Sequence, residues 1–354
     1  MHKLKEEAKK LLQQLIETPS LSREEENTAN ILADYLLQKG VEIKRKKNNV
    51  WAVNKHFDSQ KPNILLNSHH DTVKPNNGYT KDPFKAIIEE GKLYGLGSND
   101  AGGCLVSLIA TFVHFYEKKL PFNLILAATA EEEISGKEGI AYLLEDLPEI
   151  HLAIVGEPTL LDVAVAEKGL MVIDATVTGK AGHAARNEGI NALYEALPDL
   201  NTIKDYKFKR VSEYLGESKV SATIIQSGSQ HNVVPDKCVY TLDVRVTDSY
   251  TLQEALDELK EILKADLQPR SIRLNSSALP KDHKIWDVIH SMKLKCYGSP
   301  TLSDQALIPY PSIKIGPGDS ARSHTPDEYI YLEEIDQGID RYIDILRSYI
   351  DSIN

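Results

Sequence analysis

Acidic and histidine side chains recur along this chain directly after short apolar segments of the kind that form buried β-strands. The group SHHDTV at 68–73 continues from NILLNS, and the group TAEEEISG at 129–136 continues from NLILAAT. Functional side chains of open α/β sheets gather at the carboxyl ends of the strands. We therefore expect these groups to meet at one edge of a sheet, where they could bind divalent cations.

The first group pairs an imidazole with a carboxylate. In an extended segment His69 and Asp71 point to the same side, because side chains alternate along a strand. Asp71 could then hold the His69 imidazole in the orientation that a metal site needs. The alternative is a surface turn in which two histidines occur by chance, and this group alone does not decide between them.

The second group, YGLGSNDAGG at 94–103, places Asp100 at the start of a helix predicted over 102–118. Glycines on both sides let the backbone pass closely under a site. A carboxylate at this position is also favoured as an N-cap by the helix dipole, without any metal. Taken alone, the second group favours the N-cap.

The remaining groups are weaker when each is taken singly. Three consecutive glutamates, Glu131, Glu132 and Glu133, repel one another unless some are protonated or bind cations, although a solvated acidic loop is the simpler explanation. Glu157 follows the apolar segment LAIVG, and His324 lies in a Gly/Pro-rich loop after SIKIG. An acidic residue in a turn and an exposed loop histidine are both common.

The ordered combination is more specific than its parts. Two histidines and four carboxylates at strand ends suit a dinuclear site of the zinc type, and such a site needs no cysteine. Three ligating carboxylates against two divalent ions leave a net charge of about +1, so the site could bind water and lower its pKa towards roughly 7. Cobalt or manganese would accept the same ligands.

The elements that must position these residues form two patterns. Residues 1–167 and 281–354 predict a catalytic domain with a helix-covered, mostly parallel sheet. Residues 168–280 predict an inserted α+β domain whose open-faced sheet has alternating apolar residues and one solvated face. Near the N-terminus, helical spacing ends at Ile16 before Pro19, and Ser22 with Glu25 predicts a capping box for the next helix.

The composition excludes several classes of partner. A net charge of −11 and a pI near 5.5 argue against binding to nucleic acid or anionic membranes. No apolar run is long enough to span a bilayer, and the charged N-terminal segment does not resemble a secretory signal. Three widely spaced cysteines form neither a disulfide framework nor a CxxC site, so we expect a cytoplasmic location.

The motifs, in this order, resemble those of the M20 metallopeptidase family over nearly the whole chain. SHHDTV is similar to the family's G-H-x-D-x-V, GLGSNDAGG to its G-x-x-D-x-K-G, and TAEEE to its T-x-D-E-E; VGEPT, GKAGHAA, NVVPDKCVYTLDVR and GPGDSARSHTPDE follow in family order. Ser68, Gly102 and Glu131 depart from the residues usual at their positions. None of these departures removes a ligand or the base, but they weaken the transfer of specificity from any one subfamily.

The resemblance implies two metal ions and a role for each site residue. It implies that His69 binds one ion and His324 the other, that Asp100 bridges them, and that Glu157 and Glu133 complete the first and second sites respectively.

The resemblance also implies how the reaction proceeds. Asp71 would orient His69, and Glu132 would take a proton from the attacking water and return it to the leaving amine. The three consecutive glutamates leave a question of register, because a slip by one residue would move the roles of both Glu132 and Glu133.

In the inserted domain the resemblance implies three further residues. His183 would stabilise the oxyanion of the tetrahedral intermediate, commonly in the active site of a partner subunit, which implies a homodimer through this domain. Asn232 and Arg245 match positions that contact substrate, and Arg245 suits a bidentate grip on a carboxylate. The alternatives are a strand salt bridge for Arg245 and a turn cap for Asn232.

The implied substrate is a small N-acyl amino acid. The compact inserted domain and the GLGSNDAGG form are most similar to the acetylornithine deacetylases, which implies N-acetylornithine and a place in arginine biosynthesis. Acetyl, succinyl or formyl groups on ornithine, citrulline or lysine all remain open. An aminopeptidase or dipeptidase on the same scaffold is the nearest rival, and a non-catalytic binding protein is a rival from another class.

Overall fold

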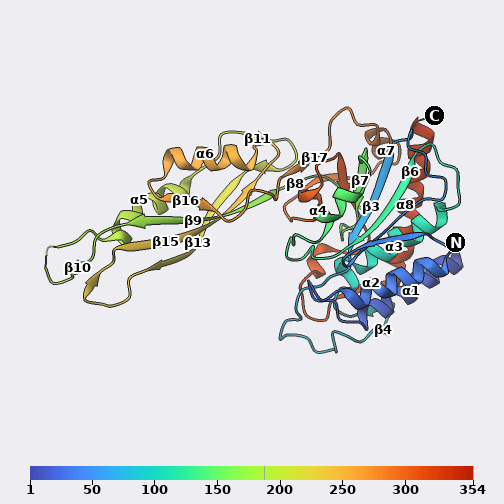
Figure 1. The fold of residues 1–354 in the computed structure, drawn as a ribbon, viewed down its shortest axis with the longest axis horizontal. Helices are drawn as coiled ribbons and strands as arrows, with labels where there is room; N and C mark the ends of the chain where they lie inside the picture. Colours follow the sequence, from blue (N-terminus) through green and yellow to red (C-terminus); the bar gives the residue numbers. More distant parts are fainter. Residues whose placement is uncertain (187, 354) are drawn as a thin grey trace. The chain divides into compact units, whose positions relative to one another are not determined.

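The computed structural model describes residues 1–186 and 188–353. The chain divides into two compact units (Figure 1). Unit 1 comprises Met1–Val165, Leu279–Tyr297 and Ser303–Asn354, and unit 2 comprises Ala166–Ala278 and Gly298–Leu302. None of the helices formed by the described residues is long and apolar enough to cross a membrane.

Unit 1 is built on a mixed sheet. Its strands lie in the order β1 (Ile43–Lys46), β2 (Asn49–Val53), β6 (Asn123–Thr129), β3 (Asn63–His69), β7 (Leu152–Val155), β19 (Ser312–Lys314) and β8 (Val163–Glu167). The central strands β6, β3, β7 and β19 are parallel, as predicted, whereas the pairs β1–β2, β2–β6 and β19–β8 are antiparallel. The predicted α/β class is confirmed, with a sheet that is parallel only at its centre.

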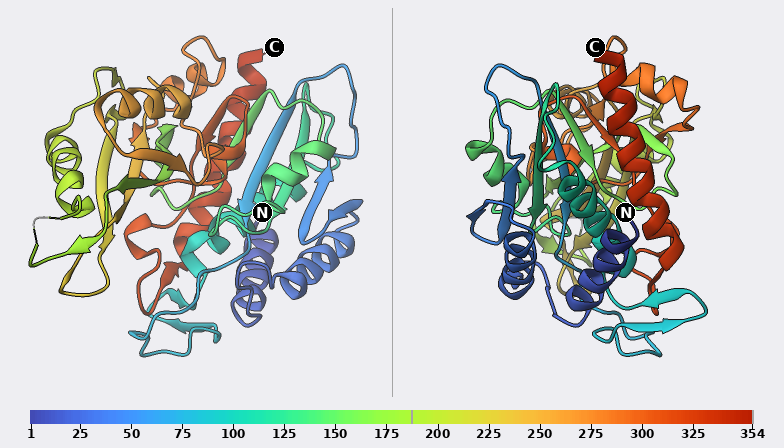
Figure 2. Two further views of the ribbon diagram at one scale, coloured as in Figure 1. Left: turned by 60° about the vertical axis from the view of Figure 1, so that its left-hand side comes forward. Right: turned by 90° about the vertical axis from the view of Figure 1, so that its right-hand side faces the viewer.

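Helices cover both faces of this sheet, because the central strands are apolar on both sides. Ile64 and Leu66 of β3 belong to the larger core, whereas Leu65 between them belongs to a second core on the opposite face. The larger core packs against α1 (His2–Ile16), α2 (Glu26–Gln38), α3 (Gly103–Phe115), α7 (Ile285–Ser291) and α8 (Leu332–Ile353). The second core packs against α4 (Ile140–Leu143), and α8 runs beside α1 and α3 (Figure 2).

The parallel register brings three chemically active segments to one edge of the sheet. His69 at the end of β3 pairs with Thr129 at the end of β6, and Asn67 pairs with Val155 at the end of β7. The segments that follow these strand ends carry Asp71, the three glutamates and Glu157. Beside them, β4 (Ile87–Glu89), β5 (Lys92–Tyr94) and β20 (Tyr329–Tyr331) form a small antiparallel sheet.

The predicted capping box at the start of α2 is wrong. Helix α2 begins at Glu26, and no side chain caps it. Ser22 Oγ instead donates to Asp71 Oδ2 at 2.7 Å, and the Glu25 carboxylate accepts from Arg23 N and Asn48 Nδ2. These longer-range contacts outweigh the local capping pattern, and they tie the segment before α2 to the strand ends.

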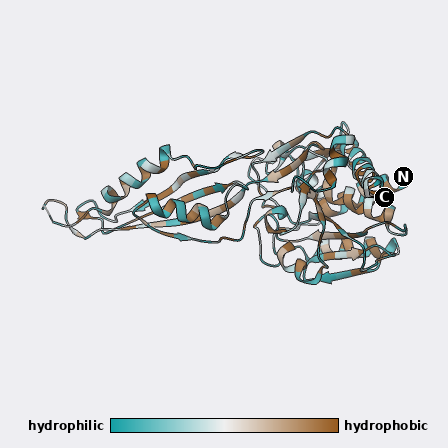
Figure 3. Ribbon diagram, turned by 90° about the horizontal axis from the view of Figure 1, so that it is seen from above, coloured by the Kyte–Doolittle hydropathy of each residue, from teal (hydrophilic) through white to brown (hydrophobic). Residues whose placement is uncertain are grey.

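Unit 2 contains an antiparallel sheet in the order β13 (Lys219–Ser227), β15 (Lys237–Val246), β9 (Gly169–Thr178) and β16 (Asp266–Pro269). Buried and partly exposed residues alternate along β9, and α5 (Ala192–Asp205) and α6 (Leu252–Ile262) pack on its buried face (Figure 1). Hydrophilic and hydrophobic residues alternate along these helices (Figure 3). The short strands of unit 2 outside this sheet are β10 (Gly182–His183), β11 (Val211–Ser212), β12 (Gly216–Glu217) and β14 (Val233–Val234). Two further short strands, β17 (Ser277–Ala278) and β18 (Cys296–Ser299), pair with β8.

Candidate metal centre

His69 is the last residue of β3, and its side chain is fully buried. Its Nδ1 lies 3.0 Å from the backbone oxygen of Asp71, so in the neutral imidazole Nδ1 carries the proton and donates it to that oxygen. The other ring nitrogen, Nε2, has no hydrogen-bond partner among the residues that the structure describes. A buried nitrogen with a free lone pair, fixed by a hydrogen bond at the opposite nitrogen, is well prepared to bind a metal ion.

Asp100 presents one carboxylate oxygen to each of the two histidines. Oδ1 lies 3.4 Å from His69 Nε2, and Oδ2 lies 3.6 Å from His324 Nε2. The residue lies in the turn Ser98–Gly102 with extended backbone, and α3 begins only at Gly103. The alternative of Asp100 as an N-cap is therefore wrong, because the N-cap of α3 is Gly102.

Glu133 and His324 form the second side of the cluster. His324 Nε2 lies 2.9 Å from Glu133 Oε2, and this hydrogen bond raises the pKa of His324 to about 9. The backbone of His324 is left-handed, with φ of 58°, and its carbonyl oxygen accepts from Asn76 Nδ2. The His324 side chain is 56% exposed, so this side of the cluster is open to solvent in unit 1.

Glu132 and Glu157 each place a carboxylate oxygen 3.7 Å from His69 Nε2. Burial raises the pKa of Glu157 to about 8 and that of Glu132 well above its ordinary value. The side chains of Glu132 and Glu133 are only 11% and 6% exposed. The alternative of a solvated acidic loop is therefore wrong for these two residues.

The charge of the cluster fits divalent cations. Burial raises the pKa of Glu132, Glu133 and Glu157. Burial alone would lower the pKa of His69, but the neighbouring carboxylates have the larger effect and raise it. Without a cation, such a site has to take up protons in its place. Two groups of residues could each hold a metal ion, His69–Glu132–Glu157 and His69–Asp100–Glu133. Within each group, the potential ligand atoms lie within 4.8 Å of one another. Nitrogen and carboxylate oxygen without thiolate suit zinc, cobalt or manganese.

Asp71 contacts more than the imidazole that it was expected to orient. Its Oδ1 lies 3.4 Å from His69 Nδ1. The same carboxylate accepts hydrogen bonds from the backbone N–H groups of Glu132 at 3.0 Å and Glu133 at 3.2 Å. Burial opposes ionisation of Asp71, but the His69 contacts and these donors lower its pKa. Asp71 therefore fixes both a histidine and the turn that carries two of the site carboxylates.

Glu131 differs from the two glutamates that follow it. Its Oε2 accepts from the backbone N–H of Glu138, and its own N–H donates to Glu25 Oε1 at 3.2 Å. Glu132 and Glu133, by contrast, face the two histidines. The fully buried Glu25 thus holds the start of this turn, a role that the sequence did not reveal because Glu25 also fits a capping pattern.

Asp304 is a second residue that the sequence reading missed. It is 3% exposed, and Thr129 Oγ1 donates to its Oδ2 at 2.8 Å. Burial raises the pKa of Asp304 to about 6, and the Asp71 charge acts in the same direction. Asp304 begins a short 3-10 helix, Asp304–Leu307, that follows none of the predicted strands, so only the three-dimensional structure brings it to the strand ends.

The three predicted site residues of the inserted domain all lie in unit 2. His183 pairs with Val233 between β10 and β14, its side chain is exposed, and the exposed Asn232 accepts from Ala184 N through its backbone oxygen. Arg245 forms a bidentate ion pair with Asp243 on the same strand, at 2.8 and 3.1 Å. The strand salt bridge considered as an alternative for Arg245 is therefore present, and the substrate contacts of these residues stay predictions.

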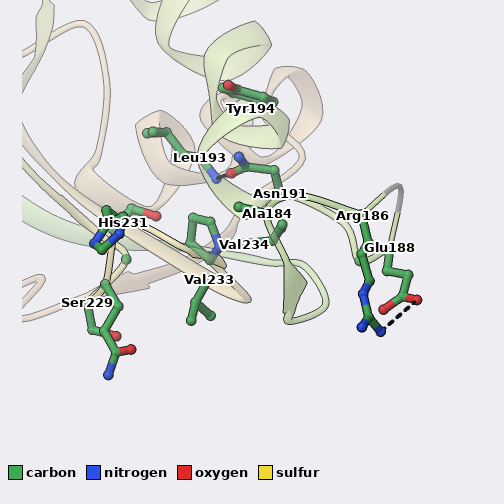
Figure 4. A pocket seen from close by; sticks show the side chains of 15 residues that line it. Ala184, Arg186, Glu188, Asn191, Leu193, Tyr194, Ser229, His231, Val233 and Val234 are labelled. Atoms are coloured by element: carbon green, nitrogen blue, oxygen red, sulfur yellow. Dashed lines mark hydrogen bonds and ion pairs between the residues drawn. The ribbon is translucent and has the colours of Figure 1, made fainter.

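A surface hollow of about 760 Å³ lies beside β10 and β14 (Figure 4). Its lining residues come from two segments of the chain: Ala184, Arg186, Glu188, Gly189, Asn191, Leu193 and Tyr194 from the first, and Ser227, Gly228, Ser229, Gln230, His231, Val233, Val234 and Pro235 from the second. Val233 and Val234 form part of its wall, and the exposed pair Arg186–Glu188 lies at one side (Figure 4).

Comparison with known proteins finds similar sequences and similar folds over nearly the whole chain. The acetylornithine deacetylases of Proteus mirabilis (strain HI4320) and Photorhabdus laumondii are 30% and 29% identical, each over 92% of both chains. Similar folds include a dinuclear metal binding M20 peptidase, YXEP, of Bacillus subtilis (TM-score 0.78, 16% identity, 99% and 100% coverage) and aminopeptidase PepT from Bacillus cereus (0.77, 18%, 98% of each chain). The model of peptidase family M20/M25/M40 matches residues 65–348, so the expected resemblance is confirmed and the chain belongs to this family.

Proposed function

We propose that this protein is a two-metal hydrolase that removes the acyl group from an N-acyl amino acid, with N-acetylornithine as the favoured substrate and arginine biosynthesis as its setting. The observation that carries the proposal is Asp100, whose two oxygens face two histidines within a buried carboxylate cluster. The choice of substrate is supported by the names of the relatives, acetylornithine deacetylases that match over nearly their whole length. The three free cysteines agree with a cytoplasmic protein.

The ligand assignment is supported by which atoms face one another, because Asp100 lies near both histidines, Glu157 lies near His69 and Glu133 lies near His324. His69, Asp100 and Glu157 would hold one ion, and Asp100, Glu133 and His324 would hold the other. When bound, two divalent ions of zinc, cobalt or manganese would polarise the amide carbonyl and lower the pKa of a water molecule. The buried lone pair of His69 Nε2 and the mixed nitrogen and oxygen donors support this assignment.

Glu132 is the proposed general base. Its carboxylate lies beside the ligand nitrogen of His69, and its backbone N–H is fixed by Asp71. Burial raises its pKa, and a carboxylate with raised proton affinity is suited to take a proton from water and return it to the leaving amine. Glu133 is hydrogen-bonded to His324 instead, which supports a ligand role for Glu133 and the base role for Glu132.

Unit 2 would supply substrate contacts and the subunit interface. We propose that His183 stabilises the oxyanion in the site of a partner copy, and that Asn232 and Arg245 contact the substrate. Large apolar side chains are exposed on α5 and on β13, namely Tyr194, Leu197, Ile224 and Ile225. Strand β13 is also at the edge of its sheet, so it could pair with the same strand of a second copy.

The first experiment measures amine release from N-acetyl-L-ornithine by protein reconstituted with zinc. N-Acetyl-L-citrulline, N-succinyl-L-ornithine and a simple dipeptide are assayed in parallel. Fast release from the first substrate alone supports the full proposal. Turnover of another acyl amino acid instead would change the proposed substrate and leave the proposed reaction as it is. Preference for the dipeptide would replace the deacylase by an aminopeptidase or dipeptidase on the same scaffold.

Two controls test the chemistry independently of the substrate. Chelation should abolish turnover and added zinc should restore it, because in the proposed mechanism the metal ions polarise the carbonyl and activate the attacking water. Glu132→Gln should keep two bound ions and lose about 10²–10⁴-fold in kcat. Full activity of this variant would contradict the assignment of Glu132 as the general base. Protein that binds no metal after reconstitution would contradict the proposed metal site.

A further inference from the structure

Glu328 is a buried carboxylate, 2% exposed, that lies four residues after His324 and is not among the proposed ligands. Its oxygens accept three backbone hydrogen bonds from the loop that carries Asp100. Oε1 accepts from Asn99 N at 2.8 Å and from Asp100 N at 2.9 Å, and Oε2 accepts from Gly97 N at 3.1 Å. The backbone oxygen of Glu328 also accepts from Gly95 N at 3.0 Å.

A second set of bonds joins the same two segments through Asn99. Asn99 Nδ2 donates to the backbone oxygen of Asp319 at 3.0 Å, and Asp319 N donates to Asn99 Oδ1 at 3.1 Å. The approach is close, because a Cβ atom added to Gly318 would lie only 2.5 Å from Asn99 Oδ1. Asn99 is itself fully buried, so these bonds are shielded from water.

These two segments carry Asp100 and His324. The distance between these two residues determines how Asp100 could be shared between the two proposed ions. One segment is the turn Ser98–Gly102 with Asp100, and the other runs from Asp319 to Glu328 and contains His324. Asp100 Oδ2 lies 3.6 Å from His324 Nε2, and the Asp100 side chain also hydrogen-bonds with Ser323 of the His324 loop. Glu328 and Asn99 supply further hydrogen bonds between the two loops, so the relative position of the loops depends on these two residues as well.

A carboxylate suits this position better than its neutral isostere. Three N–H donors converge on Glu328, and a carboxylate offers two acceptor oxygens with lone pairs for all of them. Glutamine would offer one acceptor oxygen and would place an NH₂ donor against the N–H of Gly97 or of Asn99 and Asp100. A buried donor without an acceptor costs about 1–3 kcal/mol, so the loop would shift to relieve it.

We propose that Glu328, together with Asn99, is a positioning residue that sets the distance between Asp100 and His324 and thereby the geometry of the shared metal site. This inference rests on the proposed two-metal function and extends it to two residues that contact neither ion nor substrate. Groups that orient metal ligands typically change metal affinity or activity about 10–100-fold when they are replaced.

The test is Glu328→Gln with zinc content, zinc affinity, kcat and KM measured on the full chain. We expect kcat to fall about 10–100-fold and zinc affinity to fall by a similar factor, with KM changed less than about twofold. The metal–metal distance from X-ray absorption should lengthen or become heterogeneous in the variant. The matched control is Glu333→Gln, an exposed glutamate on α8 whose carboxylate contacts Gln337, and it should match the wild type.

Asn99→Ala keeps the test decisive if Glu328→Gln does not fold. It adds no charge beside the proposed metal site, removes both hydrogen bonds with Asp319, and should lower kcat and zinc affinity as Glu328→Gln does. Wild-type zinc affinity and metal–metal distance in both folded variants, even with lower thermal stability, would overturn the positioning role alone. Wild-type protein that holds only one ion would overturn the two-metal function, and the positioning role with it.

Discussion

Asp304 adds a buried charge to a site that already holds four carboxylates, and its effect on stability has a defined sign. Burial raises its pKa in the folded protein to about 6, above the ordinary 3.8 of an aspartate. The folded state therefore binds this proton more tightly than the unfolded state. The buried charge of Asp304 therefore lowers the free energy of unfolding. This destabilisation is absent below about pH 4 and complete above about pH 6.

Asp304→Asn should therefore stabilise the metal-free protein at pH 7.5. The amide oxygen can still accept from Thr129 Oγ1, while the buried charge is removed. The difference between a pKa of 6 and 3.8 corresponds to at most about 3 kcal/mol, and we expect about 1–3 kcal/mol from denaturant unfolding. The gain should shrink as the pH falls towards 4.

The same substitution should act in the opposite direction once metal is bound. A nearby negative charge favours divalent cations, so Asp304→Asn should lower zinc affinity in chelator competition. The exposed Asp34→Asn on α2 serves as the control for both measurements. A stability gain of equal size at pH 4.5 and 7.5 would contradict the charge explanation.

At the scale of elements, the turn between β6 and α4 depends on one glycine. Glu131 adopts φ of 57°, and Gly136 N donates to its backbone oxygen at 2.7 Å, which closes a tight turn around Glu132 and Glu133. A Cβ atom on Gly136 would lie 1.9 Å from Glu131 Oε2 and 2.4 Å from its Cβ. The conflict involves the rigid Cβ atom, so the turn itself would have to move.

Gly136→Ala should therefore reduce activity more than stability. A displacement of about 1 Å in catalytic groups can cost up to about 10²-fold in rate, and we expect at least about a tenfold loss of kcat in the zinc-loaded protein. Gly40→Ala is the control: its φ of 73° strains an alanine, but no atom lies within 4 Å of the added Cβ. It should cost about 1–2 kcal/mol of stability and leave kcat unchanged.

The sequence predicts elements well where a single physical cause dominates. NLILAAT at 123–129 coincides with β6, because a continuous apolar run between polar turns fits a strand buried on both faces. The helix predicted over 102–118 begins within one residue of α3, but the N-cap role considered for Asp100 and the capping box predicted for α2 were wrong. In both cases Asp100, Ser22 and Glu25 use their polar groups for distant partners instead of the nearest helix end.

The candidate site was predictable from its motifs, whereas the groups that support it were not. SHHDTV contains two histidines, and only the structure shows that His70 bonds to Thr28 Oγ1 and the Asn48 backbone oxygen, away from the carboxylate cluster. Burial lowers the pKa of His70 to about 4, which keeps it neutral. Glu25 and Glu328 likewise act through backbone N–H groups far along the chain, and such partners leave no local pattern in the sequence.

At the scale of the whole molecule, the exposed apolar residues of unit 2 predict association of two chains. Ile225 on β13 is 48% exposed, and Tyr194 on α5 is 66% exposed. Strand β13 is an edge strand that pairs only with β15 among the described residues, so its other edge could pair with a second chain. Ile225→Lys should shift the protein from dimer to monomer in sedimentation velocity. Val211→Lys, at an apolar residue that is 62% exposed on β11, should leave the dimer intact.

Mixing two inactive variants tests whether each active site needs its partner's His183. His183→Ala removes the proposed oxyanion contact, and Glu132→Gln removes the proposed base, so each homodimer should be nearly inactive. If His183 acts across the interface, a mixed dimer contains one site with an intact Glu132 and the partner's intact His183. Random exchange of subunits makes about half of the dimers mixed, so about a quarter of wild-type activity should return. A His183 that acts within its own chain would restore none, because every site would then lack one of the two groups.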